Sequence, residues 1–188
     1  MGKNTKTIIC ITGMPGAGKT TVNEIIKKKF NLPIIVMGDV IREEAKIRGI
    51  PQTSENLSLL MLKMRKEMGA NIVALKCIET MKNIESDFIV IEGVRNLEEV
   101  EEFKKLGKVI VIVVHSSPRT RFQRLTSRGR SDDPKTWEEF CLRDLRELDI
   151  GIGKVIALAD EVIVNEENIE NLEKEAIKVI SKVMGYGC

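Results

Sequence analysis

Short runs of aliphatic residues alternate along this chain with longer segments in which apolar positions recur every three or four residues. The runs are rich in isoleucine and valine, which is typical of strands buried on both faces, and the longer segments have the periodicity of amphipathic helices. We expect strands at about 7–12, 34–37, 87–92, 108–114 and 161–164. We expect helices at about 18–30, 39–48, 54–67, 70–84, 96–106, 118–127, 134–148, 152–159 and 168–184. This alternation predicts an α/β fold with a five-stranded parallel sheet between layers of helices.

Capping residues support several of the expected helix starts. Ser54 and Asn96 are residues that favour the N-cap position, and Pro118 follows two serines, as a proline in the first helical turn often does. The residues from Arg119 to Asp133 are dense in charge and in turn formers. We therefore expect this segment to be mobile.

The first expected strand leads directly into a glycine-rich sequence. Residues 13–20 read GMPGAGKT and match G-x-x-x-x-G-K-[ST] between a strand and a helix, the context that this motif requires. The glycines let backbone N–H groups curl around phosphate, the lysine supplies a positive charge to the β- and γ-phosphates, and the threonine hydroxyl can hold Mg²⁺. The sequence therefore predicts an ATP site made by Gly13, Met14, Pro15, Gly16, Ala17, Gly18, Lys19, Thr20 and Thr21.

The second expected strand ends in Gly38 and Asp39, and Arg42 follows. A helix that begins at Asp39 would carry Arg42 in its first turn, toward the carboxyl edge of the sheet, where ligands bind in open α/β folds. A guanidinium fork at that edge suits a phosphate. Alternatively, Arg42 pairs with a nearby carboxylate on a solvated face; the candidates are Glu43, Glu44 and Asp39.

The third expected strand ends in Glu92, followed by Gly93 and, two residues later, Arg95. Glu92 would lie beside the glycine-rich loop, where a carboxylate can orient Mg²⁺ or its water ligands together with Thr20. Arg95 would reach the same anion as Arg42 from the other side. The alternative is that Glu92 caps a helix and Arg95 lies on the surface.

Arginines gather after the fourth expected strand, at Arg119, Arg121, Arg124, Arg128 and Arg130. Phosphoryl transfer depends on positioning and on cations at the transferring oxygens, so a segment that carries arginines over the phosphates and excludes water is what a kinase lid needs. A basic surface for nucleic acid is the alternative interpretation.

Three of these segments together resemble the adenylate kinase branch of P-loop kinases. MGDVIR at 37–42 resembles the signature that opens the monophosphate-binding helix, and EGVR at 92–95 resembles an aspartate-glycine-x-x-arginine segment, with Glu92 in place of the aspartate. The sequence RSDD at 130–133, followed by Arg143, resembles the lid, which is short here. The resemblance implies Mg²⁺-ATP as donor. It implies that Arg42, Arg95 and Arg143 hold an acceptor phosphate while Lys19, Arg124 and Arg130 act on the donor phosphates.

The C-terminal segment ALADEVIVN at 157–165 is similar to dephospho-coenzyme A kinases. In those enzymes a similar asparagine precedes a loop over the donor adenine, which implies that Asn165 binds the nucleotide. The whole chain resembles an archaeal group of adenylate-kinase-related proteins. The resemblance divides a single domain into a core at 1–38, 86–125 and 150–188, a monophosphate-binding region at about 39–85 and a lid at about 126–137.

Composition removes several other classes of protein. The chain has 188 residues, 30 Lys and Arg against 28 Asp and Glu, and a formal net charge of +2, so it has no excess of charge to attract nucleic acid. No apolar run approaches the roughly 20 residues that span a bilayer, and no signal-peptide pattern is present, so we expect a cytoplasmic protein without a membrane partner. Four scattered cysteines and the single His115 do not make a zinc site, which leaves hard cations bound through oxygen.

The sequence thus favours a kinase that moves the γ-phosphoryl group of ATP to a small acceptor, with AMP or a similar nucleotide as the first candidate. A dephospho-coenzyme A kinase is an alternative within the same class. A switch that binds ATP and AMP, hydrolyses ATP slowly and engages an RNA or protein partner is the alternative from another class. Stimulation of ADP release by one acceptor would separate the enzymes from the switch.

Overall fold

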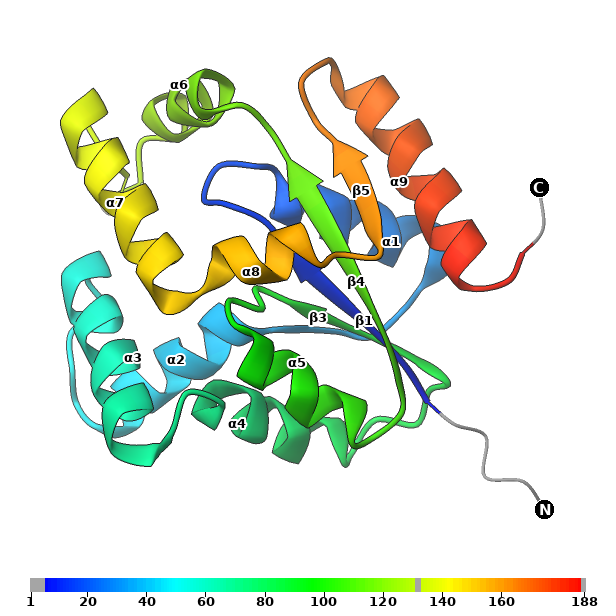
Figure 1. The fold of residues 1–188 in the computed structure, drawn as a ribbon, viewed down its shortest axis with the longest axis horizontal. Helices are drawn as coiled ribbons and strands as arrows, with labels where there is room; N and C mark the ends of the chain where they lie inside the picture. Colours follow the sequence, from blue (N-terminus) through cyan, green and yellow to red (C-terminus); the bar gives the residue numbers. More distant parts are fainter. Residues whose placement is uncertain (1–5, 131–132, 187–188) are drawn as a thin grey trace.

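A computed structural model describes residues 6–130 and 133–186 of the chain. Its centre is a sheet of five parallel strands in the order β2-β3-β1-β4-β5 (Figure 1). The strands are β1 (Thr7–Thr12), β2 (Ile34–Val36), β3 (Phe88–Glu92), β4 (Lys108–His115) and β5 (Glu161–Val164). The α/β fold and the five-stranded parallel sheet predicted from the sequence are therefore confirmed.

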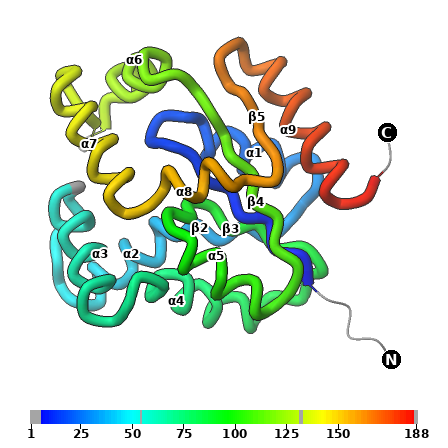
Figure 2. Tube along the Cα trace, viewed as in Figure 1, coloured from blue at the N-terminus to red at the C-terminus, as the bar shows by residue number. Residues whose placement is uncertain are grey.

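Helices cover both faces of this sheet (Figures 1 and 2). In chain order they are α1 (Lys19–Phe30), α2 (Met37–Ile47), α3 (Ser54–Met68), α4 (Ile72–Met81), α5 (Leu97–Lys104), α6 (Pro118–Arg128), α7 (Trp137–Ile150), α8 (Ile152–Ala157) and α9 (Ile169–Val183). Helices α1 and α9 lie side by side on one face, and α2, α4, α5 and α8 pack on the other. The result is a three-layer α/β/α domain.

Alternation of side chains along each strand supplies both cores. In β1, Ile8 and Cys10 point into the core shared with α2 to α5 and α8, whereas Ile9 and Ile11 point into the core shared with α1 and α9. All four side chains are fully buried. A strand that is buried on both faces needs apolar residues at every position, which is why the strands read as continuous isoleucine and valine runs.

The strand order reverses at β1, and the position of this reversal predicts where a ligand site lies. Strand β1 lies between β3 and β4, so the chain leaves its carboxyl end where connections run toward opposite edges of the sheet. Such a reversal opens a crevice outside the carboxyl ends of the strands. The carboxyl ends of β1, β3 and β4 are where the glycine-rich loop, residues 93–95 and the N-terminus of α6 begin.

Some predicted boundaries were wrong. Helix α2 begins at Met37 and not at Asp39, because it follows β2 directly: Val36, the last residue of the strand, has extended backbone and is also the N-cap of the helix. The N-cap of α3 is Thr53 and not Ser54: the Thr53 side chain accepts a hydrogen bond from the Asn56 backbone N–H at 3.2 Å. Asn96 does cap its helix as predicted.

The segment expected to be mobile is mostly helical. Ser117 caps α6, Pro118 occupies its first turn, and the helix continues to Arg128. Aromatic rings of Phe122, Trp137 and Phe140 pack together between α6 and α7. Mobility of the residues beyond this helix stays a prediction, as does the division of the domain into core, monophosphate-binding region and lid.

Candidate active site

The glycine-rich loop is held by contacts that exclude side chains. A Cβ atom at Gly13 would lie 2.3 Å from the carbonyl oxygen of Val114, and one at Gly18 would lie 2.2 Å from Nδ2 of Asn165. Both glycines have positive φ angles, 142° and 101°. The loop therefore needs glycine at these positions both for its backbone conformation and for its close approach to β4 and to Asn165.

Lys19 follows the loop at the start of α1 and points back over it. Its ammonium group donates hydrogen bonds to the carbonyl oxygens of Gly13 at 2.6 Å and Met14 at 3.3 Å. Burial lowers the pKa of Lys19 to about 8, an effect that the charge of Glu92 opposes. A cation held by backbone carbonyls and partly stripped of water is suited to an incoming phosphate, which would stabilise the charged form.

Glu92 lies at the carboxyl end of β3 as predicted, next to β1. The register pairs it with Ile11, and its side chain accepts a hydrogen bond from Asn23 of α1 at 3.0 Å. Asn23 comes one helical turn after Thr20, so the helix brings the Thr20 and Glu92 positions to the same end of the sheet. Oxygen ligands of this kind fit a magnesium ion that also contacts phosphates and water.

The described residues contain no cluster of three or more His, Cys, Asp or Glu side chains able to hold a metal ion by themselves. Magnesium commonly binds through one or two protein groups together with substrate phosphates, so Thr20 and Glu92 fit this mode and not a closed protein cage.

Arg124 and Asn165 meet at the phosphate loop, although they are 41 residues apart. The Arg124 guanidinium donates to the Ser116 hydroxyl at 2.9 Å and to Oδ1 of Asn165 at 3.2 Å. Asn165 in turn donates through Nδ2 to the Ala17 carbonyl at 2.9 Å. Both predicted nucleotide-binding residues therefore lie against the loop, and Ser116, which the sequence interpretation did not select, joins them to it.

Arg121 has a different role from its neighbour. It is 3% exposed, and two of its guanidinium nitrogens donate to the carboxylate of Asp144 at 2.9 and 2.5 Å. It also donates to the Pro15 carbonyl at 3.1 Å and lies over the ring of Phe140, 4.8 Å from its centroid. This arginine ties the phosphate loop to α7 and is already fully engaged.

Arg42 is at the carboxyl edge of the sheet, but it is paired with a carboxylate. Its Nε and Nη2 atoms donate to Oδ1 of Asp39 at 3.0 and 2.5 Å, and both side chains are exposed. Its guanidinium also lies over Gly38, where a Cβ atom would be 3.6 Å from Nη1. The structure thus has the local ion pair that was the alternative interpretation of Arg42.

Arg95 lies where three helices meet. Its Nε is 3.1 Å from Oε2 of Glu147 in α7, and its Nη1 is 2.8 Å from the sulfur of Met61 in α3. The Glu147 oxygen is not aligned for a hydrogen bond and has no hydrogen-bond partner among the described residues. Just before Arg95, a Cβ atom at Gly93 would lie 3.7 Å from Met37, so the EGVR segment borders the start of α2.

Asp133 organises the predicted lid. Its carboxylate accepts hydrogen bonds from the Arg128 side chain and from the Arg130 backbone N–H, and it is 3.6 Å from Arg143. Burial raises the pKa of Asp133, but the hydrogen bonds from Arg128 and Arg130 outweigh it and lower the pKa overall. The side chain of Arg130 is exposed. Ser131 and Asp132, which also belong to the predicted lid motif, lie outside the described residues.

Charged side chains from two segments, residues 92–95 and α7, act on Lys19. The carboxylates of Glu92 and Glu147 raise its pKa, and the guanidinium groups of Arg95 and Arg143 lower it. The predicted residues Glu92, Arg95 and Arg143 are therefore close enough to act electrostatically on the phosphate-loop lysine. Glu147 was not predicted, because its sequence neighbourhood on α7 resembles any charged helix face.

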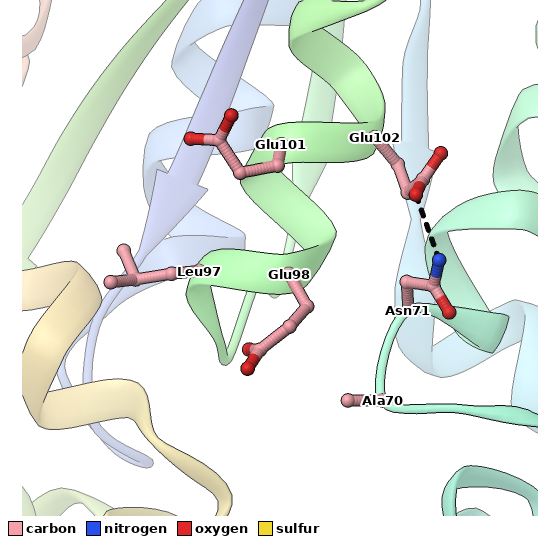
Figure 3. A pocket seen from close by; sticks show the side chains of 6 residues that line it. All are labelled: Ala70, Asn71, Leu97, Glu98, Glu101 and Glu102. Carbon is pink, nitrogen blue, oxygen red and sulfur yellow. Dashed lines mark hydrogen bonds between the residues drawn. The ribbon is translucent and has the colours of Figure 1, made fainter.

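A separate hollow of about 490 Å³ lies between the start of α4 and α5 (Figure 3). Its wall carries Glu98, Glu101 and Glu102, and Glu102 accepts a hydrogen bond from Asn71 at 2.8 Å. None of the predicted site residues lines it. Its acidic wall and its position away from the phosphate loop do not suit a phosphate-bearing ligand.

Within the part of the chain that the structure describes, no helix is both long enough and apolar enough to cross a bilayer.

A phosphate loop after β1, a parallel sheet whose order reverses there, and converging arginines at its carboxyl edge define a P-loop kinase-like domain. In agreement, a family model described as an AAA domain matches residues 12–141. The chain belongs to the UPF0200 protein family. It is 47% identical over 180 residues to the UPF0200 protein of Hyperthermus butylicus, covering 96% of each chain. It is 49% identical over 181 residues to that of Pyrococcus furiosus, covering 94% of this chain and 97% of the other. The predicted archaeal P-loop family is thus confirmed.

Solved structures share the fold at lower identity. A structure of TT1252 from Thermus thermophilus has a TM-score of 0.65 at 20% identity and covers 95% of this chain and 98% of that one. A shikimate kinase from Acinetobacter baumannii in complex with shikimate has a TM-score of 0.61 at 16% identity, with 97% and 96% covered. A gluconokinase from Sinorhizobium meliloti has a TM-score of 0.56 at 14% identity, with 98% and 97% covered.

Proposed function

We propose that this protein is an ATP-dependent phosphotransferase that moves the γ-phosphoryl group of Mg²⁺-ATP to a small acceptor, with a nucleoside monophosphate such as AMP as the first candidate. The observation that carries the proposal is the position of Lys19, whose ammonium group lies over the glycine-rich loop on the carbonyl oxygens of Gly13 and Met14. The charges of Arg95 and Arg143 also lower the pKa of this lysine, and we place their guanidinium groups beside the γ-phosphate. Cations placed there stabilise the charge of a transferring phosphoryl group.

The donor would bind along the loop from Gly13 to Thr21. Backbone N–H groups of the loop and of the first turn of α1 would face the β- and γ-phosphates, with Lys19 between them. Arg124 and Asn165, which lie against Ala17, would contact the nucleotide from the β5 side. Thr20 and Glu92 would hold Mg²⁺, which would supply positive charge to stabilise the phosphate oxygens of the departing ADP.

The acceptor would bind on the other side of Lys19, near Gly38, Asp39 and Gly93. Arg42, Arg95 and Arg143 would hold its anionic group in line with the γ-phosphate. A phosphate acceptor is already ionised at neutral pH, so the transfer needs no general base. Lys19, Arg124, Arg130 and Arg143 would stabilise the transferring group, which requires Arg130 and the rest of the lid at 126–137 to close over the donor and exclude water.

A second candidate acceptor is the hydroxyl group of a small acid. It is favoured by Asp39, an exposed carboxylate at the acceptor edge that could accept a hydroxyl proton, and the fold is shared with a kinase solved with shikimate. A dephospho-coenzyme A kinase activity is compatible with the position of Asn165 at the phosphate loop. We place the protein in the cytoplasm, with these small molecules as its partners.

The test is an ADP-release assay with Mg²⁺-ATP and either AMP, other monophosphates, dephospho-coenzyme A, shikimate or no acceptor. Stimulation by one acceptor, lost in Lys19→Ala by on the order of 10²-fold or more, is the expected result. Equal, slow release with every acceptor and with none would contradict the kinase proposal and favour the ATP-binding switch.

A further inference from the structure

A buried ion pair joins α3 to α5 next to the proposed acceptor site. Nη2 of Arg65 is 2.5 Å from Oε1 of Glu99, and the two side chains are 10% and 0% exposed. The other carboxylate oxygen, Oε2, accepts a hydrogen bond from the backbone N–H of Arg95 at 2.8 Å. Glu99 therefore has a partner for each oxygen.

Arg65 is far less satisfied than its partner. Its Nε and Nη1 atoms are buried and have no hydrogen-bond partner among the described residues. A guanidinium presents five N–H donors in a fixed fork, and burying such donors without acceptors is costly. The contact from Nη2 is enough to neutralise Glu99. The unpaired donors Nε and Nη1 therefore indicate that Arg65 serves a second hydrogen-bond acceptor besides Glu99.

Arg95 lies beside this ion pair, and one of its donors has only a weak acceptor. Its Nη1 contacts the thioether of Met61, which is a weak acceptor, and Met61 lies one helical turn before Arg65 on α3. Met61 therefore contacts the Arg95 guanidinium and lies one turn from Arg65 on the same helix, and Arg65 has unpaired donors. The Thr12 hydroxyl, one residue before the phosphate loop, donates to the Val94 carbonyl at 2.7 Å, so the segment that carries Arg95 borders the loop.

We propose that Arg65 is a further acceptor-binding residue, which holds an anionic group of the acceptor together with Arg95. The inference rests on the proposed function, and it adds that the acceptor is a small molecule with a phosphate monoester or a carboxylate. Met61 moves aside when this group enters, as an unbranched thioether side chain can, and the oxygens of the anion take the unpaired donors of Arg65 and the Nη1 donor of Arg95 that Met61 leaves. Phosphate and carboxylate share this recognition chemistry, so the test uses both.

Direct binding separates this role from a purely structural one. We would measure calorimetric affinities for AMP, dephospho-coenzyme A, shikimate, inorganic phosphate and ADP. The variants are Arg65→Lys, which keeps the charge without the fork, and the double variant Arg65→Met/Glu99→Gln, which removes both buried charges so that neither is left alone. Lys104→Met, at an exposed ion pair on α5, is the matched control. Thermal unfolding of each variant shows that it is folded.

The expected result is that the wild type binds at least one of the anions. Both Arg65 variants bind it about tenfold or more weakly, while ADP affinity stays within about twofold and the control is unchanged. Loss with AMP and dephospho-coenzyme A identifies a phosphate site, and loss with shikimate alone identifies a carboxylate site. Equal anion affinity in wild type and variants, or a wild type that binds none of these anions, would overturn the inference. Arg65-dependent binding without any acceptor-stimulated ADP release would keep Arg65 as an anion-binding residue and reject the proposed kinase.

Discussion

Cations on the donor side of the site have different partners from cations on the acceptor side. On the donor side, Lys19 donates hydrogen bonds to two backbone carbonyls, and Arg124 donates to a hydroxyl and an amide oxygen. On the acceptor and lid side, four arginines have carboxylate partners, in the pairs Arg42–Asp39, Arg65–Glu99, Arg95–Glu147 and Arg143–Asp133. The donor side uses neutral partners and the acceptor side uses charged ones.

This difference predicts different binding behaviour. A phosphate displaces a neutral carbonyl from a cation easily, because a charge-assisted hydrogen bond is about twice as strong as a neutral one. An acceptor anion must instead compete with carboxylates for its arginines, and ion pairs must rearrange when it binds. We therefore expect the donor site to be preformed and the acceptor site to be completed by its ligand.

Breaking the link between the two sides should have the largest effect. Arg121 joins the Pro15 carbonyl of the donor loop to Asp144 of α7, the helix that carries Arg143 and Glu147. Arg121→Met would leave the Asp144 carboxylate poorly solvated and without its partner, and we expect it to lower the free energy of unfolding in urea by about 3–5 kcal/mol. Lys178→Met removes an exposed pair with Glu175 and should change it by less than about 0.5 kcal/mol. Equal effects of the two substitutions would show that Arg121 does not hold the sides together.

Distorting the donor loop alone should have the next largest effect. Gly13→Ala would place a methyl group 2.3 Å from a backbone oxygen in β4 at a φ angle of 142°, so the loop must shift. We expect a loss of about 2–3 kcal/mol in the free energy of unfolding, and loss of ATP binding in calorimetry. Gly129→Ala is the control: its φ angle is 63°, no atom lies within 4 Å of the added carbon, and the expected cost is about 1 kcal/mol. ATP binding that survives Gly13→Ala would contradict a preformed donor loop.

The sequence predicted the donor side better than the acceptor side, because the donor side is built from residues that are neighbours in the sequence. Glycine spacing, strand and helix lie within one continuous segment, so the loop from Gly13 to Thr21 could be recognised from its neighbours alone. Strands were placed within about a residue because burial on both faces leaves few polar positions in them. The start of α2 was missed, because no turn residue marks the change from strand to helix at Val36.

Pairings between distant residues could not be predicted. Asn23 and Glu92 are 69 residues apart, and Arg65 and Glu99 are 34 apart. Their meeting depends on how the helices pack on the sheet, and no local pattern in the sequence records it. Even for Arg42, whose partner is close in the chain, the sequence offered three carboxylates and could not choose among them.

The pH dependence of ATP binding tests the state of Lys19 on the donor side. Burial holds the pKa of Lys19 at about 8 in the free protein, and a bound phosphate should raise it. Below about pH 8 the lysine is already protonated, so affinity is constant; above it, binding must take up a proton, and affinity should fall by up to about tenfold per pH unit. Calorimetry with ATP from about pH 7 to about pH 9.5 checks this. The ATP affinity of Lys19→Arg should show no such fall, because arginine does not titrate in this range. If the affinity of the wild type were also constant, Lys19 would already be protonated over this pH range before phosphate binds.

Removing one competing carboxylate on the acceptor side should have the smallest effect. The direction of the change in acceptor affinity shows whether the carboxylate competes with the acceptor. Asp39→Asn leaves Arg42 without its ion pair at an exposed position, so no large loss of stability is expected. If Arg42 must leave Asp39 to bind the acceptor, the substitution should tighten acceptor binding by about two- to fivefold, because an exposed pair is worth roughly 0.2–1 kcal/mol. Arg42→Gln should weaken it, while ATP affinity stays constant in both variants.

Steady-state kinetics with the preferred acceptor then separate the two candidate acceptors. For a phosphate acceptor, which arrives ionised, Asp39→Asn should lower KM for the acceptor with little change in kcat. For a hydroxyl acceptor, Asp39 would take the proton, and kcat should fall by about 10²-fold or more as the base is lost. A raised KM with unchanged kcat would fit neither candidate acceptor, since it would mean that Asp39 helps to hold the acceptor. In that case Asp39 would not compete with the acceptor for Arg42.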